Sequence, residues 1–216
     1  MSTRLEWKIG ASSLHRVIES EDAILGPFEI FGDCTQMHLD ENRDWLMPRF
    51  QDPASGLLII TIQSFLIKQA DLTVLVDCCA GNDKDRKRPH FHRQKRPWLE
   101  TLRAAGARPE DIDVVLCTHL HVDHIGWNTR LENGKWVPTF PNARYLIAQR
   151  EWDFWRNAGP AALERTGDFL TDSVLPIIDS GQAEMIGDTH ALKSDISIEP
   201  VHGHTPGQKM LRLGSG

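Results

Sequence analysis

The feature that most constrains this chain is a group of metal-ligand side chains that directly follows a short apolar run. The run is Val114–Cys117, and the group is Thr118-His119-Leu120-His121-Val122-Asp123-His124. A short, wholly apolar run is typical of a strand buried on both faces. His119 and His121 are two positions apart, so an extended backbone directs both side chains to one side. We therefore expect both imidazoles to reach one metal ion, with Asp123 and His124 directed to a second ion nearby.

A second group of candidate ligands lies far along the chain, in Val201-His202-Gly203-His204-Thr205-Pro206-Gly207. Its glycines and proline specify a tight turn that presents one side chain. His204, inside this turn, is the candidate third imidazole for the first ion, and His202 is expected beside it or at the surface. Imidazoles with one carboxylate suit Zn²⁺ or a similar divalent ion. The alternative, scattered histidines without a shared role, does not explain why several ligand-type residues follow one strand.

Composition narrows the class of protein. The chain has 216 residues, 40% hydrophobic and 25% charged, which is the ordinary mix of a soluble globular protein and excludes a disordered one. We expect a single domain over residues 1–216. No apolar run approaches the roughly 20 residues that span a bilayer. The first eight residues have no apolar stretch, and the four cysteines form no CxxC pair, so we expect no signal peptide and a cytoplasmic protein with reduced thiols.

Periodicity and turn signals give a coarse order of elements. They predict strands at 14–18, 28–31, 57–68, 72–77, 114–117, 144–148, 183–186, 196–201 and 209–213. They predict helices at 97–105, 149–157 and 161–175, and a short helix at 42–46 capped by Asp40. Asn133-Gly134 predicts a tight hairpin within 127–137, since both turn positions need positive φ. This order indicates an α/β layered domain.

A basic segment departs from the average composition. It contains Lys84, Arg86, Lys87, Arg88, Arg93, Lys95 and Arg96. The segment is either a site for an anionic ligand or a solvated loop, and we favour the loop. The net charge of the chain is −6, so we do not expect a nucleic-acid partner. His90 and His92 form a second HxH pair in this segment, but no Asp-His follows them, and we do not expect them to bind metal.

These motifs resemble those of a known family. HLHVDH at 119–124 is similar to the HxHxDH signature of the metallo-β-lactamase superfamily, GHTPG at 203–207 to its second metal motif, and Val76-Asp77 to the aspartate beneath its metal site. QSFLI at 63–67, VDCCAGNDK at 76–84 and THLHVDHIGWNT at 118–129 resemble the branch with methyl parathion hydrolase-like enzymes and quorum-quenching lactonases. The resemblance implies an αββα sandwich with the metals at one edge of two sheets.

The resemblance also implies a role for each candidate residue. His119, His121 and His204 would hold the first metal, and Asp123 and His124 would bind the second. Asp77 and Thr118 would orient the ligand imidazoles. Two Zn²⁺ ions are expected in an intact site, with Mn, Fe, Co or Ni as alternatives.

The sequence departs from the family pattern after GHTPG. The pattern continues with a bridging aspartate and a late histidine, and residues 208–216 contain neither. We therefore expect a C-terminally truncated chain, a sandwich that is incomplete at that end, and a sheet with an exposed edge.

The expected activity is metal-dependent hydrolysis of an ester, lactone or phosphotriester. A divalent ion lowers the pKa of bound water to about 7, which gives hydroxide at neutral pH. Asp123 is the candidate catalytic residue, because it would orient the nucleophile or pass a proton to the leaving group. Trp127 and Phe140 would either line an apolar pocket or belong to the core.

Several alternatives stay open. Thioester hydrolysis of the glyoxalase II type and nuclease activity use the same HxHxDH core, and a sulfur dioxygenase would need mononuclear iron. A non-catalytic metal-binding protein is the alternative from another class, because the later metal ligands are absent. We expect a small-molecule substrate and no membrane association, and a homodimer remains an open alternative.

Overall fold

The computed structural model describes residues 5–164 and 166–214. The chain divides into two compact units, a larger one within residues 1–19 and 63–216 and a smaller one of residues 20–62. Strands β2 (Ser12–Leu25) and β3 (Leu58–Gln69) belong in part to each unit. That residues 1–216 form one domain stays a prediction.

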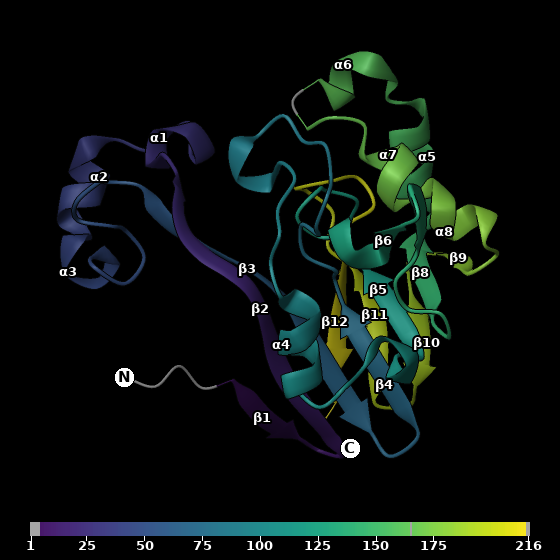
Figure 1. Ribbon diagram of the computed structural model, residues 1–216. Coiled ribbons are helices and arrows are strands. Elements are labelled where there is room, and N and C mark those ends of the chain that lie inside the picture. Colours follow the sequence, from purple (N-terminus) through teal and green to yellow (C-terminus); the bar gives the residue numbers. More distant parts are fainter. Residues whose placement is uncertain (1–4, 165, 215–216) are drawn as a thin grey trace. The chain divides into compact units, whose positions relative to one another are not determined.

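Two sheets and a hairpin build the strands of the larger unit (Figure 1). The seven-stranded sheet has the order β1-β2-β3-β4-β5-β8-β9, and its further strands are β1 (Glu6–Ile9), β4 (Leu72–Val76), β5 (Val114–Cys117), β8 (Arg144–Ala148) and β9 (Ala183–Ile186). The three-stranded sheet contains β10 (His190–Lys193), β11 (Ile196–Pro200) and β12 (Lys209–Leu213). Strands β6 (Thr129–Glu132) and β7 (Lys135–Pro138) form the predicted hairpin, with φ of 50° at Asn133 and 77° at Gly134.

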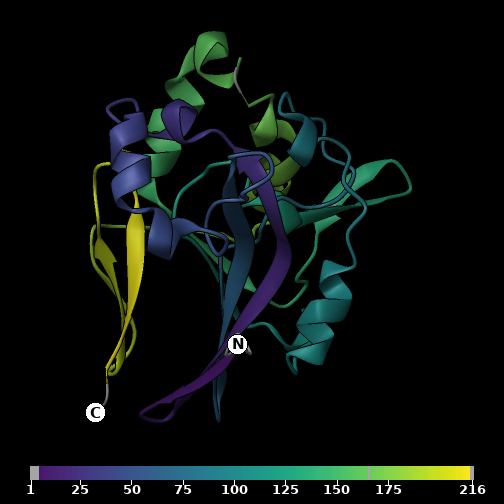
Figure 2. The same ribbon diagram turned by 90° about the vertical axis from the view of Figure 1, so that its left-hand side faces the viewer.

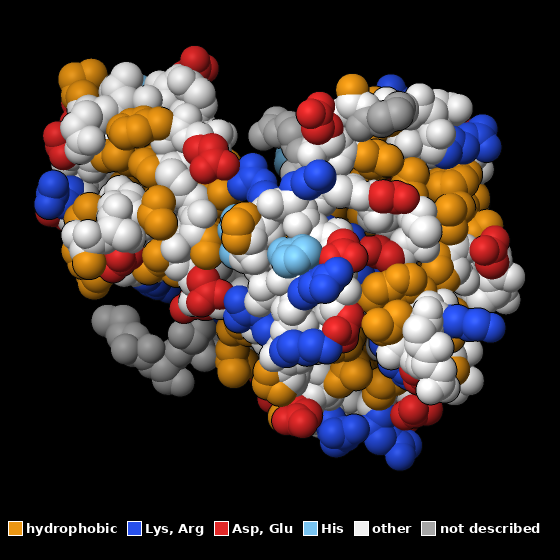
Figure 3. All heavy atoms as spheres, turned by 45° about the horizontal axis from the view of Figure 1, so that its top comes forward, with side chains coloured by type: hydrophobic (Ala, Val, Ile, Leu, Met, Phe, Trp, Pro, Cys, Tyr) orange, Lys and Arg blue, Asp and Glu red, His pale blue; other side chains and the backbone are white. Residues whose placement is uncertain are grey.

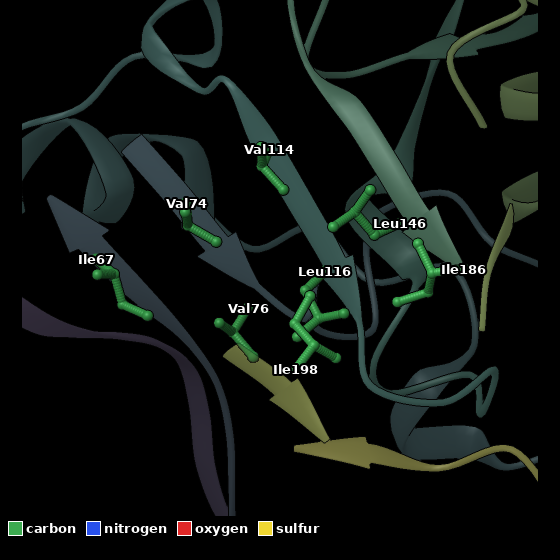
Figure 4. Packing of buried hydrophobic residues seen from close by; sticks show 8 residues of the cluster. All are labelled: Ile67, Val74, Val76, Val114, Leu116, Leu146, Ile186 and Ile198. Carbon is green, nitrogen blue, oxygen red and sulfur yellow. The ribbon is translucent and has the colours of Figure 1, made fainter. Parts of the chain in front are cut away.

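The core of the larger unit lies where the two sheets face each other. Strands of the seven-stranded sheet contribute β-branched and leucine side chains to it, and β11 contributes Ile198 from the smaller sheet (Figure 4). Its members are Ile67, Val74, Val76, Val114, Leu116, Leu146, Ile186 and Ile198. All four residues of β5 are buried, as the apolar run predicts for a central strand. The packed sheets confirm the predicted α/β sandwich class.

Helices pack on the outer side of the seven-stranded sheet. Figure 2 shows the three-stranded sheet, the larger sheet and α4 (Trp98–Ala104) as successive layers. The buried indole of Trp98 donates to the carbonyl oxygen of Val17 on β2 (3.2 Å), which attaches α4 to the sheet. The other helices of this unit are α5 (Gln149–Asn157), α6 (Gly159–Leu163), α7 (Phe169–Ser173) and α8 (Leu175–Asp179). Short 3₁₀ turns lie at η1 (Pro89–Phe91), η2 (Pro109–Asp111) and η3 (Gly126–Asn128).

The strand directions determine where loops meet. Strands β4, β5, β8 and β9 are mutually parallel, so their carboxyl ends lie at one edge of the sheet. In open parallel sheets this edge is where ligands bind, because the loops there converge. The segments that follow β4, β5 and β8 begin with Asp77, Thr118 and Gln149. The predicted ligand loop at 118–124 is therefore directly beside the loop that carries Asp77.

The smaller unit contains α1 (Pro27–Ile30), α2 (Gln36–Glu41) and α3 (Arg43–Leu46). The strand predicted at 28–31 is wrong: Pro27 starts a helical turn, in which Phe31 N donates to the carbonyl oxygen of Pro27. The short helix predicted at 42–46 exists as α3, but its N-cap is Asn42, whereas Asp40 lies inside α2. Hydrophobic side chains lie at the surface of the lobe formed by α1–α3 (Figure 3).

The single helix predicted at 161–175 is also wrong, because three short helices occupy this region. Gly167 has a φ of +89°, which ends helical geometry before α7 begins at Phe169. Pro176, expected to end the helix, instead lies in the first turn of α8. Arg165, within the predicted helix, lies outside the described residues.

The strand predicted at 14–18 is longer in the structure, where β2 continues to Leu25, and α2, β1 and β10 lie where no element was predicted. The other predicted helices and strands agree with the structure to within a few residues. In the described ranges, every helix falls short of the length and hydrophobicity that crossing a bilayer requires.

Candidate metal centre

Backbone hydrogen bonds hold the loop after β5 against the loop after β4. Cys78 N donates to the carbonyl oxygen of His124 (2.6 Å), and Gly126 N donates to that of Cys79 (2.7 Å). Within the loop, His124 N donates to the carbonyl oxygen of His121 (3.0 Å), which closes a turn. The loop that carries the histidines is therefore held in place by the two central parallel strands, β4 and β5.

Three of the predicted ligands come together. His119, His121 and His204 each offer one ligand atom, and these atoms lie within 4.8 Å of one another. The ring centroids of His119 lie 4.7 Å from His121 and 4.9 Å from His204. His204 Nε2 and His121 Nδ1 are 2.9 Å apart, at hydrogen-bond distance. Residues 83 positions apart along the chain thus share one site.

The environment of these imidazoles suits a metal ion. His119 is only 3% exposed, and its Nε2 is buried without a hydrogen-bond partner in the described part of the chain. Burial, with the neighbouring His124 and His121, lowers the pKa of His119 to about 2. Burial and His204 also lower the pKa of His121. Neutral imidazole is the form that binds metal, so an unpaired nitrogen in this cluster fits a divalent ion.

Asp77 connects the loop after β4 to the histidine loop after β5. Its Oδ1 accepts from Thr118 N and its Oδ2 from the Thr118 hydroxyl, both at 2.8 Å. The same Oδ2 lies 2.8 Å from His124 Nδ1, and the Thr118 hydroxyl lies 3.0 Å from His119 Nδ1. Asp77 and Thr118 therefore contact one imidazole each from the two predicted metal positions, and such contacts fix the orientation of ligand rings.

His124 and Asp123 lie beside the three-histidine cluster. The His124 ring centroid is 4.1 Å from that of His119, and its Nε2 is 3.5 Å from Asp123 Oδ2. Burial by itself would lower the pKa of His124, but the charge of Asp77 and its hydrogen bond outweigh burial and raise this pKa to about 9. A metal at this position would therefore displace a proton from His124 at neutral pH. The role of this pair as ligands of a second metal stays a prediction.

The second metal motif forms a turn between β11 and β12 on the smaller sheet. Gly203 has a φ of 150°, and Gly203 N donates to the carbonyl oxygen of Thr205. Lys209 N donates to the carbonyl oxygen of Thr118 (2.8 Å), so the first residue of β12 joins the loop after β5. The two sheets are thereby connected next to the cluster, which explains how His204 reaches His121.

Sequence reasoning missed Glu151, in the first turn of α5. Its Oε1 accepts from Leu120 N (3.1 Å) and from the indole nitrogen of Trp155 (2.8 Å), and its Oε2 accepts from Gly207 N (2.9 Å). The sequence did contain a signal for a buried acidic residue. Glu151 is four residues before Trp155, so its carboxylate shares a helical face with a large apolar side chain. An ionisable residue on such a face is worth testing as a functional residue.

Other histidines lie outside the cluster. His202 is exposed, with its Nε2 3.8 Å from Asp188 Oδ1. His92 Nδ1 accepts from Arg86 N within the basic segment. The metal-capable group within the described residues contains neither His90 nor His92.

The basic segment is not the solvated loop that the sequence favoured, at least at two of its cations. Lys84 is 0% exposed and Arg86 is buried. The Arg86 guanidinium forms a two-point pair with the Asp172 carboxylate (2.6 and 2.8 Å). The segment is therefore partly interior, because Asp172 on α7 supplies a counter-charge that lies 86 positions away along the chain.

The two candidate pocket aromatics belong to the core. Trp127 is stacked on Trp98 with ring centroids 5.5 Å apart, and Phe140 meets Trp98 edge-on at 6.4 Å. Both Trp127 and Phe140 are buried. Of the two interpretations, the core role is confirmed.

Comparison with known proteins supports the assignment that the geometry suggests. The model of the metallo-beta-lactamase superfamily matches residues 60–216. The N-acyl homoserine lactonase AiiB of Agrobacterium fabrum is 29% identical over 110 residues, which are 44% of this chain and 40% of that protein. The chain thus matches well under two thirds of this relative's length.

Solved structures share the fold. A probable metal-dependent hydrolase from Staphylococcus aureus superposes with a TM-score of 0.76 at 20% identity, over 97% of this chain and 71% of that one. The dizinc quorum-quenching lactonase AidC superposes with a TM-score of 0.74 at 24% identity, over 98% of this chain and 70% of that one. The family model covers most of the chain, including both histidine motifs, and the chain belongs to the metallo-β-lactamase superfamily.

Proposed function

We propose that the protein is a metal-dependent hydrolase that acts on a lactone or another small ester. The observation that carries this proposal is the cluster of His119, His121 and His204, in which a buried imidazole nitrogen has no partner among the described residues. A divalent ion bound there supplies Lewis acidity, which polarises a carbonyl group and acidifies water at neutral pH. Zn²⁺ is the proposed ion, because three imidazoles suit it and because AidC is described as a dizinc lactonase.

The chain's own residues would position the reaction. Thr118 and Asp77 hold the rings of His119 and His124, so these imidazoles keep their orientation before substrate arrives. Asp123 is only partly exposed, and its Oδ2 lies 3.5 Å from His124 Nε2. We propose that its carboxylate orients the attacking water and then passes the proton to the leaving oxygen.

An open groove with apolar and charged lining includes Trp155, which contacts the cluster, although none of the three histidines lines it. It has a volume of about 770 Å³, and its lining includes Trp155, Leu163 and Leu170. Trp155 also meets His121 edge-on, with ring centroids 5.6 Å apart. The volume falls within the range of roughly 300–1,000 Å³ that is usual for small-molecule sites. We propose that the acyl part of the substrate lies in this groove, with its carbonyl directed to the histidines.

The charges near the site favour a small substrate over nucleic acid. Lys84 and Arg86 are bound to Asp172, Arg93 to Asp85, and Lys95 to Asp83. Paired cations attract phosphate less, because their charge is already compensated. A nuclease role therefore receives less support than lactone or ester hydrolysis.

The test combines metal analysis with a substrate panel. We expect purified protein to bind Zn²⁺ and to hydrolyse at least one of a series of N-acyl lactones, aryl esters and phosphotriesters. His121→Ala is expected to lower kcat/KM by more than about 100-fold, since even groups that only support metal ligands are worth 10–100-fold. His190→Ala, on β10, is the matched control and should keep the activity of the original protein.

Two outcomes would contradict the proposal. Protein without stoichiometric Zn, Mn, Fe, Co or Ni after growth with these metals would exclude the metal site. Full metal occupancy without turnover of any substrate in the panel would instead support a non-catalytic metal-binding protein.

A further inference from the structure

The two histidine loops belong to different sheets, so their spacing needs a connection. His119 and His121 follow β5 of the larger sheet, whereas His204 precedes β12 of the smaller one. A metal ion accepts ligand atoms only within a few tenths of an ångström of its preferred distances. A group that fixes the separation of the loops would therefore influence metal affinity without touching the metal.

Glu151 bonds to both loops through one carboxylate. Leu120, whose N–H it accepts, lies between His119 and His121, and Gly207 lies three residues after His204. Glu151 is 1% exposed, so these bonds do not compete with water. Hydrogen bonds from N–H groups to a buried carboxylate are among the stronger ones in proteins, because the acceptor is charged.

The surroundings of Glu151 leave little freedom for movement. A Cβ added at Gly207 would lie 2.3 Å from Glu151 N and 2.6 Å from Glu151 Cβ, so the turn is in direct contact with α5. Trp155, one helical turn further, donates its indole N–H to Glu151 and lies edge-on to His121. Helix α5 thus contacts the His121 loop through the Glu151 carboxylate and the Trp155 ring. Its backbone at Glu151 lies directly against the turn that follows His204.

We propose that Glu151 is a positioning residue that sets the distance between the His121 loop and the His204 loop, and thereby the affinity of the three-histidine site for a divalent metal. This inference rests on the proposed metal site, but it concerns a residue that does not bind the metal. Glu151 holds Leu120 N and Gly207 N at a fixed separation before the ion arrives. Loss of the carboxylate would let the two loops move apart, so each metal-binding event would first have to order them.

The experiment compares Glu151→Ala and Glu151→Gln with a matched control. Glu19 offers the control, because its carboxylate also accepts two backbone N–H groups, from Ala80 and Gly81, and one indole N–H, from Trp127. Glu19→Gln therefore removes the same kind of bond from a place that does not connect the two loops. Zn²⁺ affinity is measured by chelator competition, and ligand geometry by the visible spectrum of the Co²⁺-substituted protein.

We expect Glu151→Ala to bind Zn²⁺ about 10–100-fold more weakly, with a changed Co²⁺ spectrum. Glu151→Gln should be intermediate, because the amide keeps one acceptor oxygen but directs an NH₂ group at the other donor. Glu19→Gln should keep the affinity and the spectrum of the original protein.

Two results have distinct meanings. Glu151→Gln is nearly isosteric, so it tests the inference even if Glu151→Ala does not fold. An unchanged Zn²⁺ affinity and Co²⁺ spectrum in Glu151→Gln would overturn the role of Glu151 and leave the proposed hydrolase intact. Failure of the original protein to bind Zn²⁺ or Co²⁺ would instead overturn the proposed function.

Discussion

Lys84 shows how far a residue's setting can differ from its sequence context. Its Nζ donates to the Thr129 hydroxyl (2.5 Å) and to the carbonyl oxygen of Asp172 (2.8 Å), and it lies 3.6 Å from the centre of the Trp136 ring. These partners follow Lys84 by 45 to 88 positions, so no local pattern among the neighbouring cations reveals them. A run of basic residues predicts a solvated loop only where no distant acid meets it.

The burial of Lys84 predicts a pH-dependent stability. Desolvation lowers the pKa of Lys84 to about 7, although Asp172 opposes the shift and Arg86 adds to it. Between that value and the ordinary lysine pKa of about 10.4, the unfolded chain binds the proton and the folded chain does not. The free energy of unfolding should therefore rise with pH, and Lys84 should contribute up to about 1.4 kcal/mol per pH unit above about pH 8.

Denaturant unfolding of the metal-free protein and of Lys84→Met checks this prediction. Arg86 still pairs with Asp172 in the variant, so the change removes only the titrating amine. The stability difference between the two proteins should shift in favour of the original protein from about pH 7 to about pH 9. Parallel curves over this range would mean that Lys84 keeps its proton in the folded state.

At the scale of elements, the sequence predicted what local patterns determine. The buried strand Val114–Cys117, the turn at Asn133-Gly134 and the HxHxDH loop each have their signal within a few residues. The region around Gly167 does not, because that glycine is adjacent to Asp85: a Cβ at Gly167 would lie 3.1 Å from the Asp85 carbonyl oxygen. A helix break of this kind depends on tertiary contact, so the local sequence does not predict it. The position of Glu151 between two loops depends on tertiary contact in the same way.

The crossing of two loops beneath the site gives a prediction for Gly126. A Cβ there would lie 1.8 Å from the Ala80 carbonyl oxygen, which is backbone and has no side chain to move aside. Gly126→Ala should therefore lower the free energy of unfolding by more than about 3 kcal/mol. Gly134→Ala is the control: its φ is +77°, but nothing lies within 4 Å, so about 1–2 kcal/mol is expected.

Thermal and denaturant unfolding of both glycine variants distinguishes crowding from backbone strain. Crowding predicts a much larger loss at Gly126 than at Gly134. Similar losses in the free energy of unfolding at the two positions would mean that the loops after β4 and β5 separate easily. The close contact between these loops would then contribute little to stability.

At the scale of the larger unit, the candidate ligands connect two sheets. His119 and His121 are carried by the seven-stranded sheet and His204 by the three-stranded one, whose shared core includes Leu116 and Ile198. The sequence motifs indicated this link, because a third imidazole had to come from the second motif. They could not indicate that Lys209 N and Glu151 also join the same two loops, since those bonds depend on how the sheets pack.

An ion that binds ligands from both sheets should stabilise the folded state as a whole. With free Zn²⁺ at about 100 times its Kd, the free energy of unfolding should rise by about 2.7 kcal/mol. For a chain of this size that corresponds to a Tm increase of roughly 5–10 °C relative to protein treated with EDTA. His121→Ala should lose this increase and His190→Ala should retain it, as measured by calorimetry. A Tm that does not respond to bound Zn²⁺ would mean that the ion binds the folded and the unfolded chain equally well. That result would contradict a metal site assembled from two sheets, because such a site exists only in the folded chain.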